Sequence, residues 1–157
     1  MMFAGASAIA AAFSTLFAAH TPLAPVAAEA APLAAAAVRE ADWSMRATLY
    51  HQGGGGAGPR DSLGCPPVAM RTAATDRNVA PRRSIIYIAQ TVGRRMPDGS
   101  LHDGLWYVSD TGPAIRGERI DLFTGHGRRS MDPIMDLNLQ RLTVVRMGSF
   151  EGCPPRD

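Results

Sequence analysis

Lysine is absent from this sequence, so its 16 basic residues are all arginines, and they are spread along the chain. The formal net charge is only +2. A chain of this charge without a clustered basic segment has no patch typical of nucleic-acid binding, so we expect no nucleic-acid partner. The 4 histidines are scattered without the spacing of metal ligands, and we expect no metal site.

No cofactor is expected either. The glycine run Gly53–Gly56 is not followed by the helix that would cradle a phosphate, which argues against a nucleotide or flavin site. We expect the surrounding segment, His51–Pro59, to contain neither helix nor strand. It is a flexible loop that serves either as a plain connector or as an active-site flap.

Lysine and arginine are both missing from residues 1–38, where Glu29 is the single acid and alanine is the commonest residue. The segment 1–19 has the apolarity of a signal-peptide core, and Ala28–Ala30 has the A-x-A form of a cleavage site. The basic stretch that normally precedes such a core is missing. An uncleaved membrane anchor is the alternative. We therefore expect a signal peptide or anchor plus alanine-rich tether at 1–38, and one domain at 39–157 outside the cytoplasm.

The sequence has only 2 cysteines, Cys65 and Cys153. An even number in an exported domain is the usual sign of a disulfide. A bond between them would close a long loop and stabilise the fold by about 4 kcal/mol. The alternative is a pair of buried thiols.

Helical periodicity is almost missing. Residues 131–137 form the one short, weakly specified helix we expect. Elsewhere, short apolar stretches separated by turn residues predict strands. They lie at 43–50, 84–92, 105–108, 119–123 and 142–147, with a further short apolar stretch at 68–75. This pattern indicates an all-β barrel with little helix rather than a layered α/β fold.

Two aspartates mark the ends of one stretch, Ser109–Phe123. The glycines and the proline between them predict a tight, ordered turn that could bring Asp110 and Asp121 together. The period of two places Asp121 opposite Ile120 and Leu122, and it places Asp110 on the same face as Trp106. A carboxyl beside apolar groups or a second carboxylate has a raised pKa, as a general acid near neutral pH requires. The alternative role for either aspartate is capping of a turn.

Three spaced aspartates resemble the signature of the 3D domain, which is named for them. Asp76 lies in Ala73–Pro81, and the other two lie in the segment Asp110–Asp121, which has the form DTGxAIxGxRID. The segment Ala47–Tyr50 is similar to the opening strand of the family. The resemblance covers residues 45–147 and implies a double-psi β-barrel with a six-stranded core. The family includes MltA-type murein lytic transglycosylases and stationary-phase survival proteins.

The sequence departs from the family pattern at several positions. Pro113 stands where a second glycine is usual, and Arg116 stands where lysine is common. Ala80, Arg82 and Arg83 replace the aliphatic and glycine positions of the turn after Asp76.

The resemblance implies a lytic transglycosylase that cleaves the β-1,4 bond between N-acetylmuramic acid and N-acetylglucosamine and leaves a 1,6-anhydro product. Asp121 would be the single acid and base, Asp110 its assistant and Asp76 a supporting residue. The expected partner is the glycan strand of peptidoglycan. The protein would be a monomer in the periplasm or at the outer membrane, and its N-terminal segment could attach it to the membrane. Residues expected on the substrate side are Thr48, Tyr50, Thr111, Gly112 and Gly117.

Two alternatives remain open at this point. The triplet Asp110–Gly112 is also the motif of aspartic peptidases, which would require a retropepsin-like homodimer sharing a proton between two copies of Asp110. The altered turn after Asp76 allows a barrel that binds cell-wall glycan without cleaving it.

Overall fold

The computed structural model describes residue 1, residues 40–54 and residues 56–156. The expected signal peptide or anchor at 1–38 lies outside these residues, apart from Met1. No helix in the described part of the chain is both long enough and apolar enough to span a membrane.

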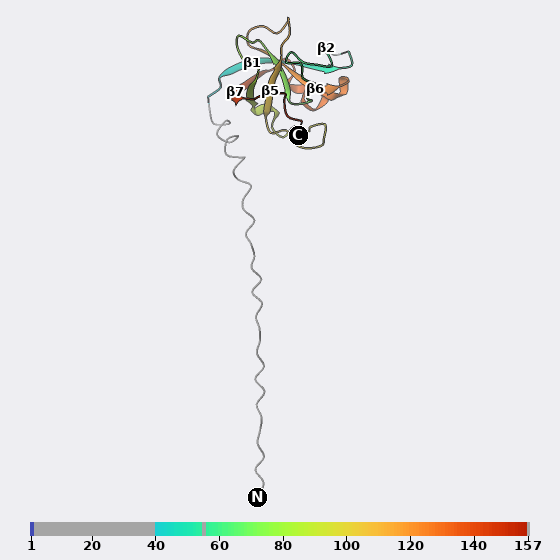
Figure 1. Ribbon diagram of the computed structural model, residues 1–157, viewed down its shortest axis with the longest axis vertical. Helices are drawn as coiled ribbons and strands as arrows, with labels where there is room; N and C mark the ends of the chain where they lie inside the picture. Colours follow the sequence, from blue (N-terminus) through green and yellow to red (C-terminus); the bar gives the residue numbers. More distant parts are fainter. Residues whose placement is uncertain (2–39, 55, 157) are drawn as a thin grey trace.

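The described chain is mostly strand. Six strands form a closed ring in the order β1-β6-β3-β5-β4-β7, which returns to β1, while the two-residue β2 extends the sheet beside β1. Figure 1 shows β1, β5, β6 and β7 gathered around one centre. The strands are β1 Trp43–Gln52, β2 Gly56–Ala57, β3 Thr72–Thr75, β4 Ser84–Ile88, β5 Leu105–Asp110, β6 Arg119–His126 and β7 Arg141–Ser149. The all-β class with a six-stranded core is confirmed.

Two connections in the ring pass over one intervening strand each. The chain leaves β1 and enters β3 on the far side of β6, and it leaves β5 and enters β6 on the far side of β3. In each case the intervening strand is parallel to one neighbour and antiparallel to the other. These two crossings are the arrangement that the term double-psi describes, and they bring β1, β6, β3 and β5 side by side.

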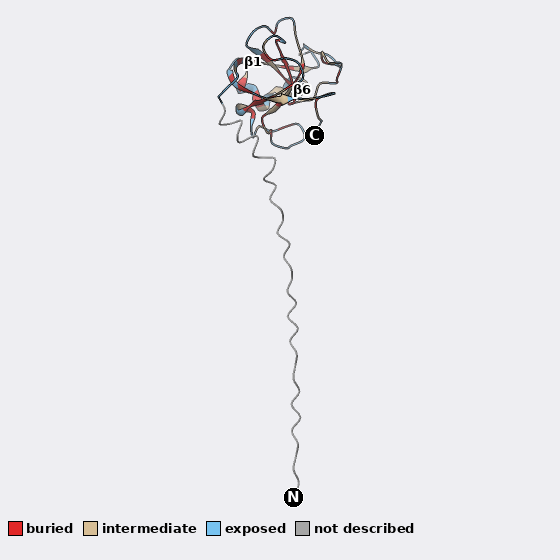
Figure 2. Ribbon diagram, turned by 60° about the vertical axis from the view of Figure 1, so that its left-hand side comes forward, coloured by how far each residue is buried: buried red, intermediate tan, exposed pale blue. Residues whose placement is uncertain are grey.

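The core lies inside the ring and is made by every second residue of its strands. Ala47 on β1, Leu122 on β6, Ala73 on β3 and Val108 on β5 are fully buried at 0% exposure. Figure 2 shows the buried residues in red along β1 and β6. Each large aliphatic side chain buried in this way contributes about 1.5–3 kcal/mol to folding. The residues that alternate with them point to the other face of the same strands.

Helix is limited, in the described residues, to two 3-10 segments, η1 Ala89–Thr91 and η2 Arg128–Leu137. The helix expected at 131–137 is therefore a longer 3-10 segment, with a kink at Ile134, directly after Pro133. Proline lacks the N–H group that a regular helix would need there.

Two other expectations about elements need correction. The strand expected at 84–92 ends at Ile88, where the Thr91 hydroxyl donates to the Ile88 carbonyl at 2.8 Å and the chain turns into η1. The segment His51–Pro59 is not free of strand, because β1 continues to Gln52 and Gly56–Ala57 form β2.

Candidate active site

Asp121 and Asp110 lie in one row across four neighbouring strands. Asp121 pairs directly with Thr48 of β1 and with Ala74 of β3, and Ala74 pairs in turn with Asp110 of β5. Directly paired residues point to the same face of a sheet. We call these four residues the carboxylate row. With two strand spacings between them, the Cα atoms of the two aspartates lie about 10 Å apart.

The prediction that Asp110 lies on the same face as Trp106 is wrong, because the pairing of β5 with β3 contains an irregularity. The pairing steps from Ala73–Val108 to Ala74–Asp110, so Ser109 is an extra residue on β5. Such a bulge re-aims the side chains that follow it. Asp110 thereby leaves the core face of Val108 and joins the face that carries Asp121.

The pKa of Asp121 is raised, mainly because the carboxyl is buried, with a smaller contribution from the negative charge of Asp110. The hydroxyl of Thr48 and the guanidinium of Arg119 oppose this rise. Its Oδ1 atom is buried and has no hydrogen-bond partner among the described residues. A raised pKa and an unoccupied oxygen are what a general acid needs.

Asp110 has the opposite environment, because three donors occupy its carboxylate. Tyr50 donates its hydroxyl to Oδ2 at 3.0 Å, while Oδ1 accepts the backbone N–H groups of Ser62 at 3.0 Å and Thr111 at 2.8 Å. The pKa of Tyr50 is raised, chiefly by burial and then by the charge of Asp110, so its hydroxyl remains a donor. Both oxygens of Asp110 thus accept hydrogen bonds within the chain.

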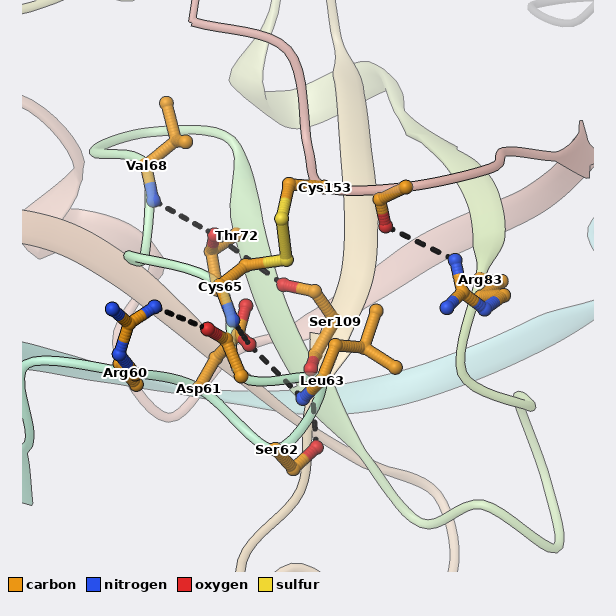
Figure 3. Close-up of a disulfide and its surroundings, with 12 residues drawn as sticks. Arg60, Asp61, Ser62, Leu63, Cys65, Val68, Thr72, Arg83, Ser109 and Cys153 are labelled. Carbon is orange, nitrogen blue, oxygen red and sulfur yellow. Dashed lines mark hydrogen bonds between the residues drawn. A yellow bond between two sulfur atoms is a disulfide. The ribbon is translucent and has the colours of Figure 1, made fainter.

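The loop that carries Ser62 is held in place by the disulfide, which sequence reasoning did not connect with the site. Ser62 also donates its hydroxyl to the carbonyl of Ser109 at 3.0 Å, as Figure 3 shows. Oδ1 of Asp61 accepts the N–H of Cys65 at 2.9 Å. Cys65 is bonded to Cys153 with a Cα–Cα distance of 5.6 Å, so the predicted disulfide is confirmed. The bond fixes this loop beside β5.

Asp76 is not part of the carboxylate row. Its Oδ1 accepts the N–H of Asn78 at 3.0 Å, and its Oδ2 accepts the N–H of Gly117 at 2.8 Å. These two backbone hydrogen bonds, the first one above all, lower its pKa. The side chain joins the turn after β3 to the loop before β6, which is a supporting role for the fold of the site.

The expected substrate-side residues are distributed over this region. Thr48 is in the carboxylate row, Tyr50 donates to Asp110, and Gly117 donates to Asp76. Thr111 and Gly112 line a hollow of about 240 Å³. Their contact with substrate stays a prediction.

A larger hollow of about 450 Å³ lies at the far end of β6 and contains none of the predicted residues. Its lining includes Met70, Met96 and Pro133 together with the side chains of Arg95 and Arg129. No residue of the carboxylate row lines this hollow. Among the described residues, no three His, Cys, Asp or Glu side chains lie together as a metal site would require.

The fold and site together define a closed six-stranded β protein that presents two aspartates in different environments on one face. Comparison with known families agrees with this description. Residues 71–133 match the model of the 3D domain. This stretch of the chain is a 3D domain, and it contains all three of the aspartates that carry the resemblance, Asp76, Asp110 and Asp121.

Several solved structures of lytic transglycosylases resemble part of this chain, including the following three. E. coli MltA with bound chitohexaose has 18% identity and a TM-score of 0.43, covering 59% of this chain and 28% of that chain. LtgG of Burkholderia pseudomallei has 25% identity and a TM-score of 0.40, and the match covers 58% of this chain and 26% of LtgG. A membrane-bound lytic murein transglycosylase from Agrobacterium tumefaciens has 30% identity and a TM-score of 0.39, and the match covers 56% of this chain and 24% of that protein. The match spans about a quarter of each of these longer proteins. None of the curated proteins matches the sequence.

Proposed function

We propose that this protein is a peptidoglycan lytic transglycosylase with Asp121 as its acid and base. The observation that carries the proposal is the state of Asp121, whose pKa is raised and whose buried Oδ1 is unoccupied, beside a second aspartate in the same row. The 3D-domain match supports the same reaction class.

The reaction needs one carboxyl to act twice. Protonated Asp121 gives its proton to the glycosidic oxygen between N-acetylmuramic acid and N-acetylglucosamine, and the bond from C1 to that oxygen breaks. The resulting carboxylate then takes the proton of the C6 hydroxyl, and O6 bonds to C1 to close the 1,6-anhydro ring. Water is not consumed, and Asp121 ends protonated as it began. Positioned acid–base catalysis of this kind contributes about 10²- to 10⁴-fold.

Asp110 assists through its charge. The three donors hold its carboxylate in one orientation. There it raises the pKa of Asp121 and stabilises the positive charge that develops on the sugar ring in the transition state. Because it is not required as a nucleophile, the separation rule for two-carboxylate glycosidases does not apply to this pair.

An aspartic peptidase fits the site less well. A peptidase dyad places two aspartates so that they share a proton, whereas Asp110 is engaged by Tyr50, Ser62 and Thr111 of its own chain. A barrel that binds glycan without cleaving it has the same surface and is distinguished by the product assay below.

Export also belongs to the proposal. A disulfide persists in an oxidising compartment, and Cys65 and Cys153 are joined here. Peptidoglycan lies outside the cytoplasm, so the periplasm or the outer membrane is the expected location.

The test is digestion of isolated sacculi followed by mass spectrometry of the soluble products. We expect muropeptides that end in 1,6-anhydro-N-acetylmuramic acid. Intact sacculi that retain bound protein would support the binding-only barrel, and reducing-end products alone would indicate hydrolysis by water.

A further inference from the structure

A second feature lies beside the carboxylate row. The hollow of about 240 Å³ is lined by Thr75, Arg77, Thr111, Gly112, Pro113 and Arg116. Thr75 directly follows Ala74 of the row, and Thr111 directly follows Asp110. β3 ends at Thr75 and β5 ends at Asp110, so the hollow lies at the ends of the two strands that carry Ala74 and Asp110.

Two arginines make this hollow cationic. Arg77 and Arg116 are exposed, and neither forms an ion pair within the residues that the structure describes. Arg116 donates at 3.4 Å to the carbonyl of Ile115. Asp76 is the neighbouring acid, but its two oxygens accept backbone N–H groups at Asn78 and Gly117. Both guanidinium groups therefore keep donors free for a ligand.

The two arginines are also held in relation to each other. Asp76 accepts one hydrogen bond from Asn78, the residue after Arg77, and one from Gly117, the residue after Arg116. A single side chain thus ties together the turn and the loop that carry the two cations. Paired arginines on an anchored backbone are suited to a carboxylate, which a guanidinium binds through two parallel hydrogen bonds.

We propose that Arg77 and Arg116 form a subsite for the carboxylate carried by the substituent of N-acetylmuramic acid. This rests on the proposed function, because glycan must lie on the row. The carboxylate has two sources, the lactyl group of a bare glycan strand or the peptide stem attached to it. In either case the subsite distinguishes muramic-acid strands from neutral chitin-like strands and sets the direction in which the strand lies.

The test measures binding without turnover, using the chain with Asp121→Asn. Isothermal titration compares three soluble glycans: a neutral N-acetylglucosamine hexamer, an amidase-treated muropeptide strand with free lactyl groups, and the same strand with its peptide stems. We expect at least one carboxylate-bearing strand to bind about 3- to 30-fold more tightly than the neutral hexamer. Which of the two binds more tightly identifies the source of the carboxylate.

Arg77→Gln with Arg116→Gln should abolish that preference and leave binding of the neutral hexamer little changed. Arg95→Gln with Arg129→Gln is the matched control, because it removes the same charge at the larger hollow and should keep the preference. The subsite is overturned if all three glycans bind equally or none binds. It is also overturned if the preference survives in the Arg77 and Arg116 double variant, or if the Arg95 and Arg129 control loses the preference to the same extent. Sacculi that release 1,6-anhydro products without any such preference would overturn the subsite alone. A preference without release would overturn the transglycosylase activity alone.

Discussion

Ala74 is paired directly with Asp121, and its small side chain separates this acid from Asp110 on the other side. Ala74 is only 2% exposed, yet it lies on the face of the sheet opposite the core. A larger side chain at this place would lie between the two carboxyl groups.

Ala74→Val should therefore reduce activity more than stability. Valine suits a strand, and the added methyl groups should cost about 1–3 kcal/mol of unfolding free energy while blocking the approach to Asp121. Release of anhydro-muropeptides and urea unfolding measure the two effects. Ala114→Val, at an exposed loop position, is the control and should leave both unchanged. Full activity in the Ala74 variant would show that substrate does not cross the row there.

Tyr50→Phe should weaken the site through Asp110. The ring stays against Phe123, where the centroids are 5.3 Å apart, but the hydroxyl that Asp110 accepts is lost. A hydrogen bond to a charged group is worth about 1.5–3 kcal/mol, so we expect a fall of about tenfold or more in the rate of release. An unchanged rate would mean that the orientation of Asp110 does not matter for the reaction.

The raised pKa of Asp121 fixes the sign of a stability change with pH. The folded state holds the proton of this carboxyl more tightly than the unfolded state. Stability therefore falls as pH rises from the ordinary value of 3.8 through the folded pKa, and stays lower above it. Asp121→Asn should be more stable than the unsubstituted chain at pH 7, with the advantage disappearing below about pH 4. Urea unfolding at a series of pH values checks this.

Asp76→Asn is the contrasting variant, because the pKa of Asp76 is lowered. Its stabilising contribution is present above the ordinary value of 3.8 and is lost as pH falls through the folded pKa,. This variant should be less stable than the unsubstituted chain at pH 7. If both substitutions shift stability in the same direction at pH 7, the assignment of their environments is wrong.

Removal of the disulfide should affect the site as well as the fold. Cys65→Ser with Cys153→Ser opens a loop closed over 88 residues and should lower the unfolding free energy by about 4 kcal/mol. It also frees the loop whose Ser62 N–H binds Asp110, so activity should fall under conditions in which the variant is still folded. Circular dichroism and product release, measured together, separate the two effects. Unaltered stability after reduction would contradict the role given to the bond.

The sequence predicts the parts of this structure that depend on local pattern. The alternation in Trp43–Tyr50 predicts β1, and the even cysteine count predicts the disulfide. The spacing from Asp110 to Asp121 is similar to the family signature, and the match at 71–133 confirms it. Turn residues between short strands are sufficient to indicate an all-β class.

The remaining features depend on contacts between distant segments. The extra residue Ser109 has no distinctive sequence signal, because it shows only in the pairing of β5 with β3. Ser62 binds Asp110 through its backbone N–H, which every residue except proline has. Ala74 lies in four consecutive buried residues of β3, so periodicity does not indicate its face. The role of each follows from strand pairing or from contacts between segments far apart in the sequence.

The most direct test of the central claim compares Asp121→Asn with Asp132→Asn, an exposed aspartate on η2, in digestion of isolated sacculi. We expect Asp121→Asn to reduce the release of 1,6-anhydro-muropeptides by about 10²- to 10⁴-fold while the variant remains folded, and Asp132→Asn to match the unsubstituted chain. Release by the Asp121 variant at the unsubstituted rate would contradict the assignment of Asp121 as the acid and base.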